Sequence, residues 1–420
     1  IMGNLYNFEE IFSILDNLEK FQQARIPLCA AENVISNFCK LPLDGDIQER
    51  YIMGNYYTYS EKNNFIGSQY LVPIYEQIHN VCKLLFDARY TDARTLSGMN
   101  CVTTLLMSLT NSGDKIAILS PASGGHPSIL PVCERLGLHV YELPYDYINF
   151  DLNYEETNCI IEAENIHYIL LAPSDIIKPM NIQNLMLNNN ILLYDISQIM
   201  GLIAGKQISN PLKISSNVVL LGGTHKTLPG PASGLIMTNN EEIHQTIEKN
   251  INPKYLRHTQ MHQVISLLLA LIESEVYGQE YSKNIILTAN ILGGILEKKG
   301  FQMLHPQEYY SNTHQLFIKC AFDEMNQIYY NALKYGVTLN TKEKKLFGNT
   351  GIRLGTQEIA RYGWKEDALE LIGDILNELR TNTPNASFID HIKQKLPPQK
   401  IMYTFPDDVI DNFKLHLHKE

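Results

Sequence analysis

Residues 218–237, VVLLGGTHKTLPGPASGLIM, restrict the fold more than any other segment, because they set one lysine between two apolar runs. The first run begins with β-branched residues and ends in Gly222 and Gly223, which allow another backbone to approach closely. Two prolines and a glycine then lead into the second run. The pattern predicts two buried strands joined by a tight connection that holds Lys226 at the edge of the core.

A lysine in such a position can form an imine with an aldehyde cofactor. Pyridoxal phosphate is the cofactor whose protein partners are a Schiff-base lysine and an acid that faces the pyridine nitrogen. Residues 191–195, ILLYD, supply a candidate acid, since an apolar run that ends in a carboxylate is typical of a buried parallel strand. Asp195 would keep the ring nitrogen protonated, and the amide of Gln198 could donate to the phenolic oxygen. An aspartate that caps a helix or closes a turn is the alternative.

Two further segments fit the same cofactor. Residues 95–100, TLSGMN, precede an apolar helical stretch that ends near Gly113, so Ser97 and Gly98 would present a hydroxyl and backbone N–H groups to a phosphate. In most proteins such residues are a simple N-cap. His126 follows two glycines in SGGHP and could lie flat over a pyridine ring, whereas a loop histidine that faces solvent is the alternative.

The strings GGTHKTLPGP, SGGH, DISQIMGLIAG and TGIRLGTQEIARYGWKE together resemble the serine hydroxymethyltransferases in order and spacing. These are fold type I pyridoxal phosphate enzymes that interconvert serine and glycine. The resemblance runs from about residue 26 to about residue 380. It implies an α/β fold in which a doubly wound, mostly parallel sheet forms a large domain and a smaller α/β domain follows.

The resemblance also implies roles for single residues, with Lys226 as the Schiff-base lysine. The cofactor-binding residues that it implies are Ser97, Gly98, His126, Ser174, Asp195, Gln198, His225 and Lys226. The catalytic candidates are Lys226, His126 and Tyr51, and the substrate-binding candidates are Arg353, Tyr51 and Glu32. Arg353 suits a substrate carboxylate because its planar fork forms two parallel hydrogen bonds, although a surface ion pair is the usual fate of an arginine.

Departures from the family pattern concern the folate side of the site. Met53 stands where the family has a glutamate that serves the proton and one-carbon chemistry, and a methionine can neither accept a proton nor hold a protonated folate group. Ala31 replaces a serine that bonds the substrate carboxylate, and Pro127 replaces a leucine that lies against the folate. Because the cofactor residues persist, the resemblance favours threonine transaldolases and related folate-independent enzymes.

We therefore expect pyridoxal phosphate-dependent cleavage or formation of a carbon–carbon bond at the α-carbon of glycine, serine or threonine, of the aldolase or transaldolase type. Three alternatives stay open. The first is a true serine hydroxymethyltransferase that uses tetrahydrofolate. The second is another outcome at the α-carbon, such as racemisation or transamination. The third is a non-catalytic relative that keeps the fold.

The charge and composition of the chain restrict the classes of partner that it can bind. The formal net charge of -11 and a pI near 5.7 argue against a nucleic-acid or anionic-membrane partner. Seven scattered cysteines lack the paired spacing of a metal site and fit a reducing compartment. The longest apolar stretch, near residues 264–272, is too short to cross a bilayer. We expect a cytoplasmic homodimer with its active site at the subunit interface, where Tyr51 acts across the boundary, and an amino acid and an aldehyde as substrates.

The alternation of apolar runs predicts the domain organisation. Residues 1–34 form a helical arm, in which FEEIFSILDNLEKFQQ has apolar residues at helical spacing and packs on another surface, either a partner subunit or the same chain. Residues 35–275 alternate strand-like and helical segments and form the large cofactor domain. Residues 276–420 form the small C-terminal domain.

Overall fold

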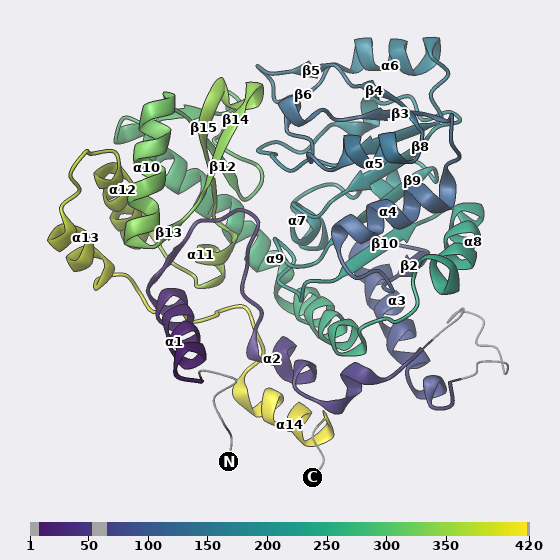
Figure 1. Ribbon diagram of the computed structural model, residues 1–420, viewed down its shortest axis with the longest axis horizontal. Coiled ribbons are helices and arrows are strands. Elements are labelled where there is room, and N and C mark those ends of the chain that lie inside the picture. The colour runs from purple at the N-terminus through teal and green to yellow at the C-terminus, as the bar shows by residue number, and fades with distance from the viewer. Residues whose placement is uncertain (1–7, 53–64, 418–420) are drawn as a thin grey trace.

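The computed structural model describes residues 8–52 and 65–417, and a seven-stranded sheet lies at its centre (Figure 1). The strands follow the order β2 (Tyr90–Asp92), β10 (Gly234–Thr238), β9 (Val218–Gly223), β8 (Ile191–Asp195), β7 (Tyr168–Leu171), β3 (Lys115–Ile118) and β4 (His139–Glu142). The five strands from β9 to β4 are parallel, whereas β10 is antiparallel to both of its neighbours. This mostly parallel sheet confirms the predicted α/β fold class.

Helices cover both faces of the sheet, which explains why its strands are apolar without interruption. On one face lie α4 (Gly98–Leu109), α5 (Ile129–Arg135) and α8 (Glu241–Asn250), packed against side chains such as Val219 and Leu221. On the other face lie α3 (Val72–Phe86), α6 (Tyr154–Ala163), α7 (Met200–Ala204) and part of α9 (Met261–Lys298), packed against Val218 and Leu220. Successive residues of β9 therefore point into different layers.

A second, antiparallel sheet has the order β11 (Gln302–Leu304), β12 (Gln315–Lys319), β15 (Asn349–Gly355) and β14 (Asn340–Lys344). Its core includes side chains of α10 (Phe322–Tyr335), α12 (Glu366–Leu379) and α13 (Ala386–Lys393). The remaining helices near this sheet and at the C-terminal end are α11 (Gln357–Arg361) and α14 (Asp407–Leu417). In Figure 1 the second sheet faces the end of the large sheet at which β8 and β9 finish.

One helix belongs to both cores. The 38 residues of α9 begin in the large core, where Leu267 and Leu271 are buried, and end in the second core, where Leu292 and Leu296 are buried. The predicted boundary at residue 275 falls inside this helix. The short strand β1 (Ile26–Pro27) pairs in parallel with β13 (Val337–Thr338), so part of the predicted arm lies with the second core. The division into three domains stays a prediction.

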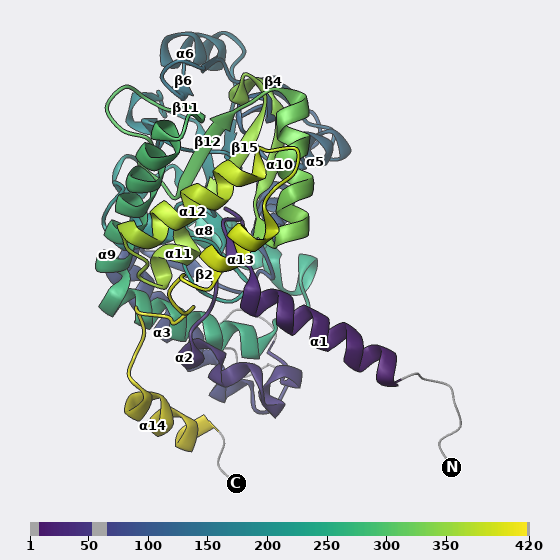
Figure 2. The same cartoon turned by 90° about the vertical axis from the view of Figure 1, so that its left-hand side faces the viewer.

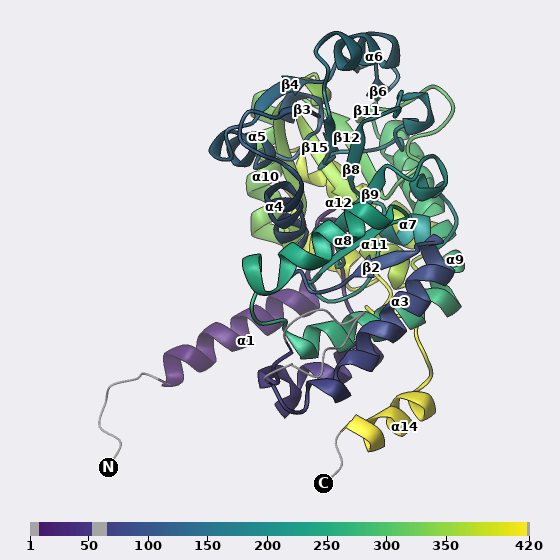
Figure 3. The same cartoon turned by 90° about the vertical axis from the view of Figure 1, so that its right-hand side faces the viewer.

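The predicted N-terminal helix is present as α1 (Phe8–Ala24). It contains no buried residue, and Phe12 and Leu15 are 59% and 55% exposed. Figures 2 and 3 show that α1 extends away from the rest of the chain. Its apolar face is therefore uncovered by the part of the chain that the structure describes.

Within residues 8–52 and 65–417, none of the helices combines the length and the apolar character needed to span a bilayer. The same residues contain no group of three or more His, Cys, Asp and Glu side chains that could hold a metal ion.

Candidate active site

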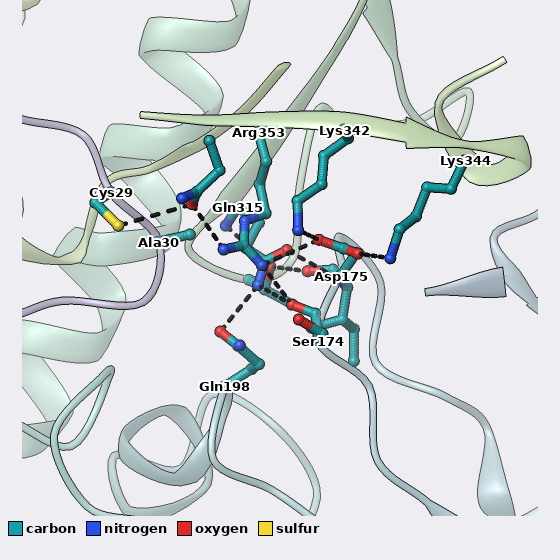
Figure 4. Close-up of polar contacts among 12 residues, drawn as sticks. Cys29, Ala30, Ser174, Asp175, Gln198, Gln315, Lys342, Lys344 and Arg353 are labelled. Carbon is teal, nitrogen blue, oxygen red and sulfur yellow. Dashed lines mark hydrogen bonds and ion pairs between the residues drawn. The ribbon is translucent and has the colours of Figure 1, made fainter. Parts of the chain in front are cut away.

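Four parallel strands of the large sheet deliver the candidate residues at their carboxyl ends, which is where ligands of open α/β sheets bind. His126 follows β3, Ser174 follows β7, Asp195 ends β8, and Lys226 follows β9. These side chains are far apart in the sequence, and the sheet order places them at one edge. Arg353 reaches the same edge from β15 of the second sheet, as Figure 4 shows for its contact with Ser174.

The connection that carries Lys226 is held from both sides. The Thr224 hydroxyl donates to the Pro231 carbonyl at 2.7 Å, and the Thr227 hydroxyl donates to the Gln198 carbonyl at 2.9 Å. The Asn33 amide donates to the Lys226 carbonyl at 2.5 Å. Burial lowers the pKa of the Lys226 amine, although Asp195 acts in the opposite direction. The amine has no hydrogen-bond or ion-pair partner among the residues described, and its burial favours the neutral, nucleophilic form.

Asp195 uses only one of its two carboxylate oxygens. The backbone N–H and the hydroxyl of Ser197 donate to Oδ1 at 2.8 and 2.5 Å. In the described part of the chain nothing donates to Oδ2, which can therefore accept from a protonated ring nitrogen. Asp195 also closes a local turn through Ser197, so the alternative structural role is present beside the predicted one.

The N-terminus of α4 abuts the end of β9. Ser97 is the N-cap, and its Oγ accepts from the Asn100 N–H at 3.1 Å. A Cβ at Gly98 would lie 2.7 Å from the Gly223 nitrogen, so only a glycine allows this approach. The first N–H groups of a helix attract an anion, and here they face the strand end that leads to Lys226. Phosphate binding by Ser97 and Gly98 stays a prediction.

Two histidines lie near Lys226: His225 directly precedes it in the connection, and His126 follows β3. His126 is half-buried and accepts from the Ser128 N–H through Nδ1 at 3.2 Å. Burial lowers its pKa, Asp195 opposes that shift, and Lys226 adds to it, which places all three in one electrostatic environment. His126 is therefore not the solvent-facing histidine of the alternative interpretation. Burial also lowers the pKa of His225, to about 4, and its Nδ1 has no partner in the described chain.

Arg353 is 4% exposed, so the surface ion pair considered for it is wrong. Its Nη1 donates to the Ser174 carbonyl at 2.8 Å and to Asp175 Oδ1 at 3.0 Å, and its Nη2 donates to Asn340 Oδ1 at 2.7 Å (Figure 4). The buried Nε has no partner among the described residues. One N–H on Nε and one on Nη2 are thus left for a carboxylate.

A group of polar residues that was not predicted from the sequence connects the two sheets. Gln315 donates to the Ser174 carbonyl at 3.0 Å and to Gln198 Oε1 at 2.9 Å, and it accepts from the Ile176 N–H at 2.9 Å. The Gln198 oxygen is therefore occupied, and its amide N–H₂ is left to donate. The only available signal was that HQLFIKC begins with two polar residues before an apolar strand. The other missed residues are Asp175, His314, Lys342 and Lys344.

Two predicted substrate residues do not join this group within one chain. Tyr51 is 38% exposed and stacks on Phe65 and His258, with ring centroids 4.7 and 4.5 Å apart. Glu32 is exposed, and its backbone carbonyl accepts from Gln357. Met53 lies outside the described residues. The roles of Tyr51 and Glu32 stay predictions.

His314 is fully buried beside the site and gives a pH prediction. Its Nε2–H donates to the Ala30 carbonyl at 3.0 Å, its Nδ1 is unpaired in the described chain, and burial lowers its pKa to about 3. The unfolded chain, with a histidine pKa near 6.5, then binds more protons than the folded protein between about pH 3 and 6.5. The free energy of unfolding should fall by roughly 1.4 kcal/mol for each pH unit below about 6.5.

Urea denaturation at two pH values checks this expectation. His314→Leu should remove its part of the pH dependence, whereas the exposed control His139→Asn should retain it. An unchanged slope in His314→Leu would contradict the assignment.

Comparisons with known proteins identify the family of this chain. The family model described as serine hydroxymethyltransferase matches residues 6–376. The chain belongs to the serine hydroxymethyltransferase family. A serine hydroxymethyltransferase of Sulfolobus acidocaldarius is 27% identical over 94% of each chain. The corresponding protein of Picrophilus torridus is 28% identical over 87% of this chain and 86% of its own length.

A solved structure gives the same fold. The crystal structure of L-threonine transaldolase from Pseudomonas fluorescens in its internal aldimine state matches with a TM-score of 0.89 at 20% identity. The match covers 97% of this chain and 96% of that one. It supports the fold type I architecture predicted from the sequence.

Pyridoxal phosphate is the cofactor of this serine hydroxymethyltransferase-like enzyme, and the residues at the strand ends fit it. Among the residues that the structure describes, Lys226 offers an unpaired buried amine, Asp195 a carboxylate oxygen without a donor, and Gln198 an amide N–H₂ without an acceptor. The N-terminus of α4 offers N–H groups to a phosphate. When bound, the cofactor supplies an electron sink that stabilises a carbanion at the substrate's α-carbon.

Proposed function

We propose that this enzyme cleaves and forms the bond between the α- and β-carbons of β-hydroxy amino acids without tetrahydrofolate. The observation that carries the proposal is the convergence of Lys226, Asp195 and Arg353 at one edge of the sheet. An amine, a ring-nitrogen partner and a carboxylate clamp are what an amino acid needs in order to react at its α-carbon.

Two residues of the chain would bind the substrate and move its proton. Arg353 would hold the substrate carboxylate through the N–H groups on Nε and Nη2, and this fixes which bond to the α-carbon faces the ring. His126 is the candidate for moving the β-hydroxyl proton. Its lowered pKa keeps the imidazole neutral near pH 7 and so able to accept that proton. The aldehyde would then leave, and the α-carbon of the remaining glycine would take up a proton or bond to a second aldehyde.

Folate independence is supported by the sequence at three positions. Met53 lacks the acid–base chemistry of the family glutamate, and Ala31 and Pro127 alter the substrate and folate sides. A true serine hydroxymethyltransferase is the second candidate, and it is favoured by the family match over residues 6–376.

Aldehyde release separates the two candidates. The purified enzyme with its cofactor is incubated with L-threonine and with L-serine, each with and without tetrahydrofolate, and the aldehyde is measured by coupled reduction. We expect acetaldehyde from threonine in the absence of folate. Turnover of serine that strictly requires folate would establish the second candidate instead. Racemised or transaminated product would assign another α-carbon reaction, and a colourless protein that ignores added cofactor would indicate a non-catalytic relative.

We also propose that the enzyme is a cytoplasmic homodimer with the active site at the subunit interface. The uncovered apolar face of α1 supports the dimer, as does Tyr51, which is 38% exposed and stacks on Phe65 and His258 within one chain. The free cysteines support a reducing compartment. Sedimentation equilibrium at the mass of a single chain would refute the dimer.

In the same way we propose the division into an arm (1–34), a cofactor domain (35–275) and a small domain (276–420).

A further inference from the structure

Three cations surround one buried carboxylate at the edge of the site. The side chain of Asp175 is 0% exposed, and it contacts Lys342 Nζ at 2.9 Å, Lys344 Nζ at 2.7 Å and Arg353 Nη1 at 3.0 Å. Figure 4 shows both lysine side chains descending from β14 toward Asp175. One arginine is sufficient to neutralise one carboxylate, so the two lysines bring surplus positive charge.

The alternation of β14 explains why both lysines point the same way. Asn340, Lys342 and Lys344 are two residues apart along the strand, so their side chains lie on one face. All three contact Arg353 or Asp175. Glu343 lies between the lysines in sequence and is exposed, so it does not offset their charge on that face.

The surplus of positive charge around Asp175 affects the pKa values of the neighbouring groups. Burial works to raise the pKa of Asp175, yet Arg353 and the two lysines hold it below its usual range. Burial and the nearby Arg353 lower the pKa of Lys342, and Asp175 does not fully compensate. Within the described residues, neither lysine forms an ion pair with any other carboxylate. Each ammonium has three N–H donors, of which the contact to Asp175 uses one.

The two lysines belong to the active site rather than to a remote surface. Both lower the pKa of His126, after burial and Lys226, so they lie within electrostatic range of the candidate proton carrier. Their side chains are 15% and 17% exposed, which leaves the ammonium groups partly open to an incoming molecule. Arg353 and the two lysines contact the same carboxylate of Asp175 (Figure 4).

We propose that the substrate carries a second anionic group, on its side chain or on the aldehyde that becomes its side chain, and that Lys342 and Lys344 bind this group. This inference rests on the proposed function and names its substrate class, an acidic β-hydroxy amino acid. Arg353 holds the α-carboxylate, and the lysine pair holds the distal anion. A carboxylate and a phosphate ester share the required chemistry.

Matched ligands test the proposal on the unmodified enzyme with its cofactor. Calorimetry compares aspartate with asparagine, which replaces the distal carboxylate by an amide of nearly the same shape, and neither ligand has the β-hydroxyl that the proposed cleavage needs. We expect the acid to bind roughly tenfold more tightly or better, and the preference to shrink as salt is added. Phosphoserine compared with serine shows whether a phosphate ester is bound, and phosphoserine compared with aspartate shows which of the two anionic groups is preferred. Equal or weaker binding of both acids would overturn the proposal.

Single substitutions assign the preference to the lysine pair. In Lys342→Met and Lys344→Met the ratio of acid to amide affinity should fall toward one. Lys345→Met is the matched control, because Lys345 is exposed and lies over the Tyr147 ring at 4.3 Å instead of contacting Asp175. A preference that persists in both variants would mean that the lysines only neutralise Asp175.

These binding measurements are independent of turnover. An enzyme that binds the acid selectively but releases no aldehyde would contradict the proposed reaction and leave the anion site standing. An enzyme that releases aldehyde yet binds acid and amide equally would support the proposed reaction and contradict the anion site.

Discussion

Lys226→Ala should yield a protein with no covalently attached cofactor. The Lys226 amine is buried and unpaired among the described residues, and its lowered pKa favours the neutral form that attacks an aldehyde. Its side chain makes no hydrogen bond that folding would lose, so the variant should fold. After reconstitution with pyridoxal phosphate and treatment with borohydride, intact-mass measurement should find the added mass on the natural protein and none on the variant.

Lys213→Ala is a suitable control, since Lys213 pairs with Asp87 at the surface and its side chain is 68% exposed. That variant should keep the visible absorbance band and the borohydride-stable mass. Peptide mapping decides a contrary result. A stable adduct on Lys342 or Lys344 in Lys226→Ala would show that another amine of the site captures the cofactor, and the assignment of Lys226 would fail.

Arg353→Leu should weaken amino-acid binding by roughly 2–5 kcal/mol, the usual loss when one member of a buried charge pair is removed. Glycine is the probe of choice because it has an α-carboxylate and no side chain, so the result does not depend on the lysine pair. Asp175 retains Lys342 and Lys344 as partners in this variant, and the protein should therefore fold. Spectral titration of the enzyme with its cofactor measures the affinity.

Arg380→Leu provides the comparison. Arg380 pairs with Glu324 at 2.7 Å on the surface, where an ion pair contributes about 0–1 kcal/mol and no ligand is expected. Glycine affinity should be unchanged there. Unchanged affinity in Arg353→Leu would instead mean that the free N–H groups of Arg353 do not meet the substrate.

The fold could be predicted from the sequence because its signals are local. The apolar run at residues 191–195 and the two runs on either side of Lys226 became β8, β9 and β10 of the large sheet. Parallel strands covered on both faces need continuous apolar stretches, and these stand out against polar connections. The limits of the domains were not predictable in this way, since α9 continues through the expected boundary without a proline and despite Gly278.

The site could be predicted only in part. Residues that follow strands were identified from local pattern and family resemblance, and His126, Asp195 and Lys226 do share one environment. Contacts between the two sheets depend on tertiary packing, so the pairing of Asp175 with Arg353, 178 residues apart, left no trace in the sequence. Gln315 likewise looked like an ordinary polar residue at the start of a strand.

The long helix α9 has a consequence for how the two parts of the site are spaced. Gly230, in the lysine connection, packs against Ala270 and Leu267 of α9. About three turns further along α9, the Tyr281 hydroxyl donates to the Gln357 carbonyl, two residues after the end of β15. The connection that carries Lys226 and the segment that follows the strand of Arg353 therefore both contact α9. Because both attachments lie on one helix, α9 helps to set the spacing between the segment that carries Lys226 and the strand that carries Arg353.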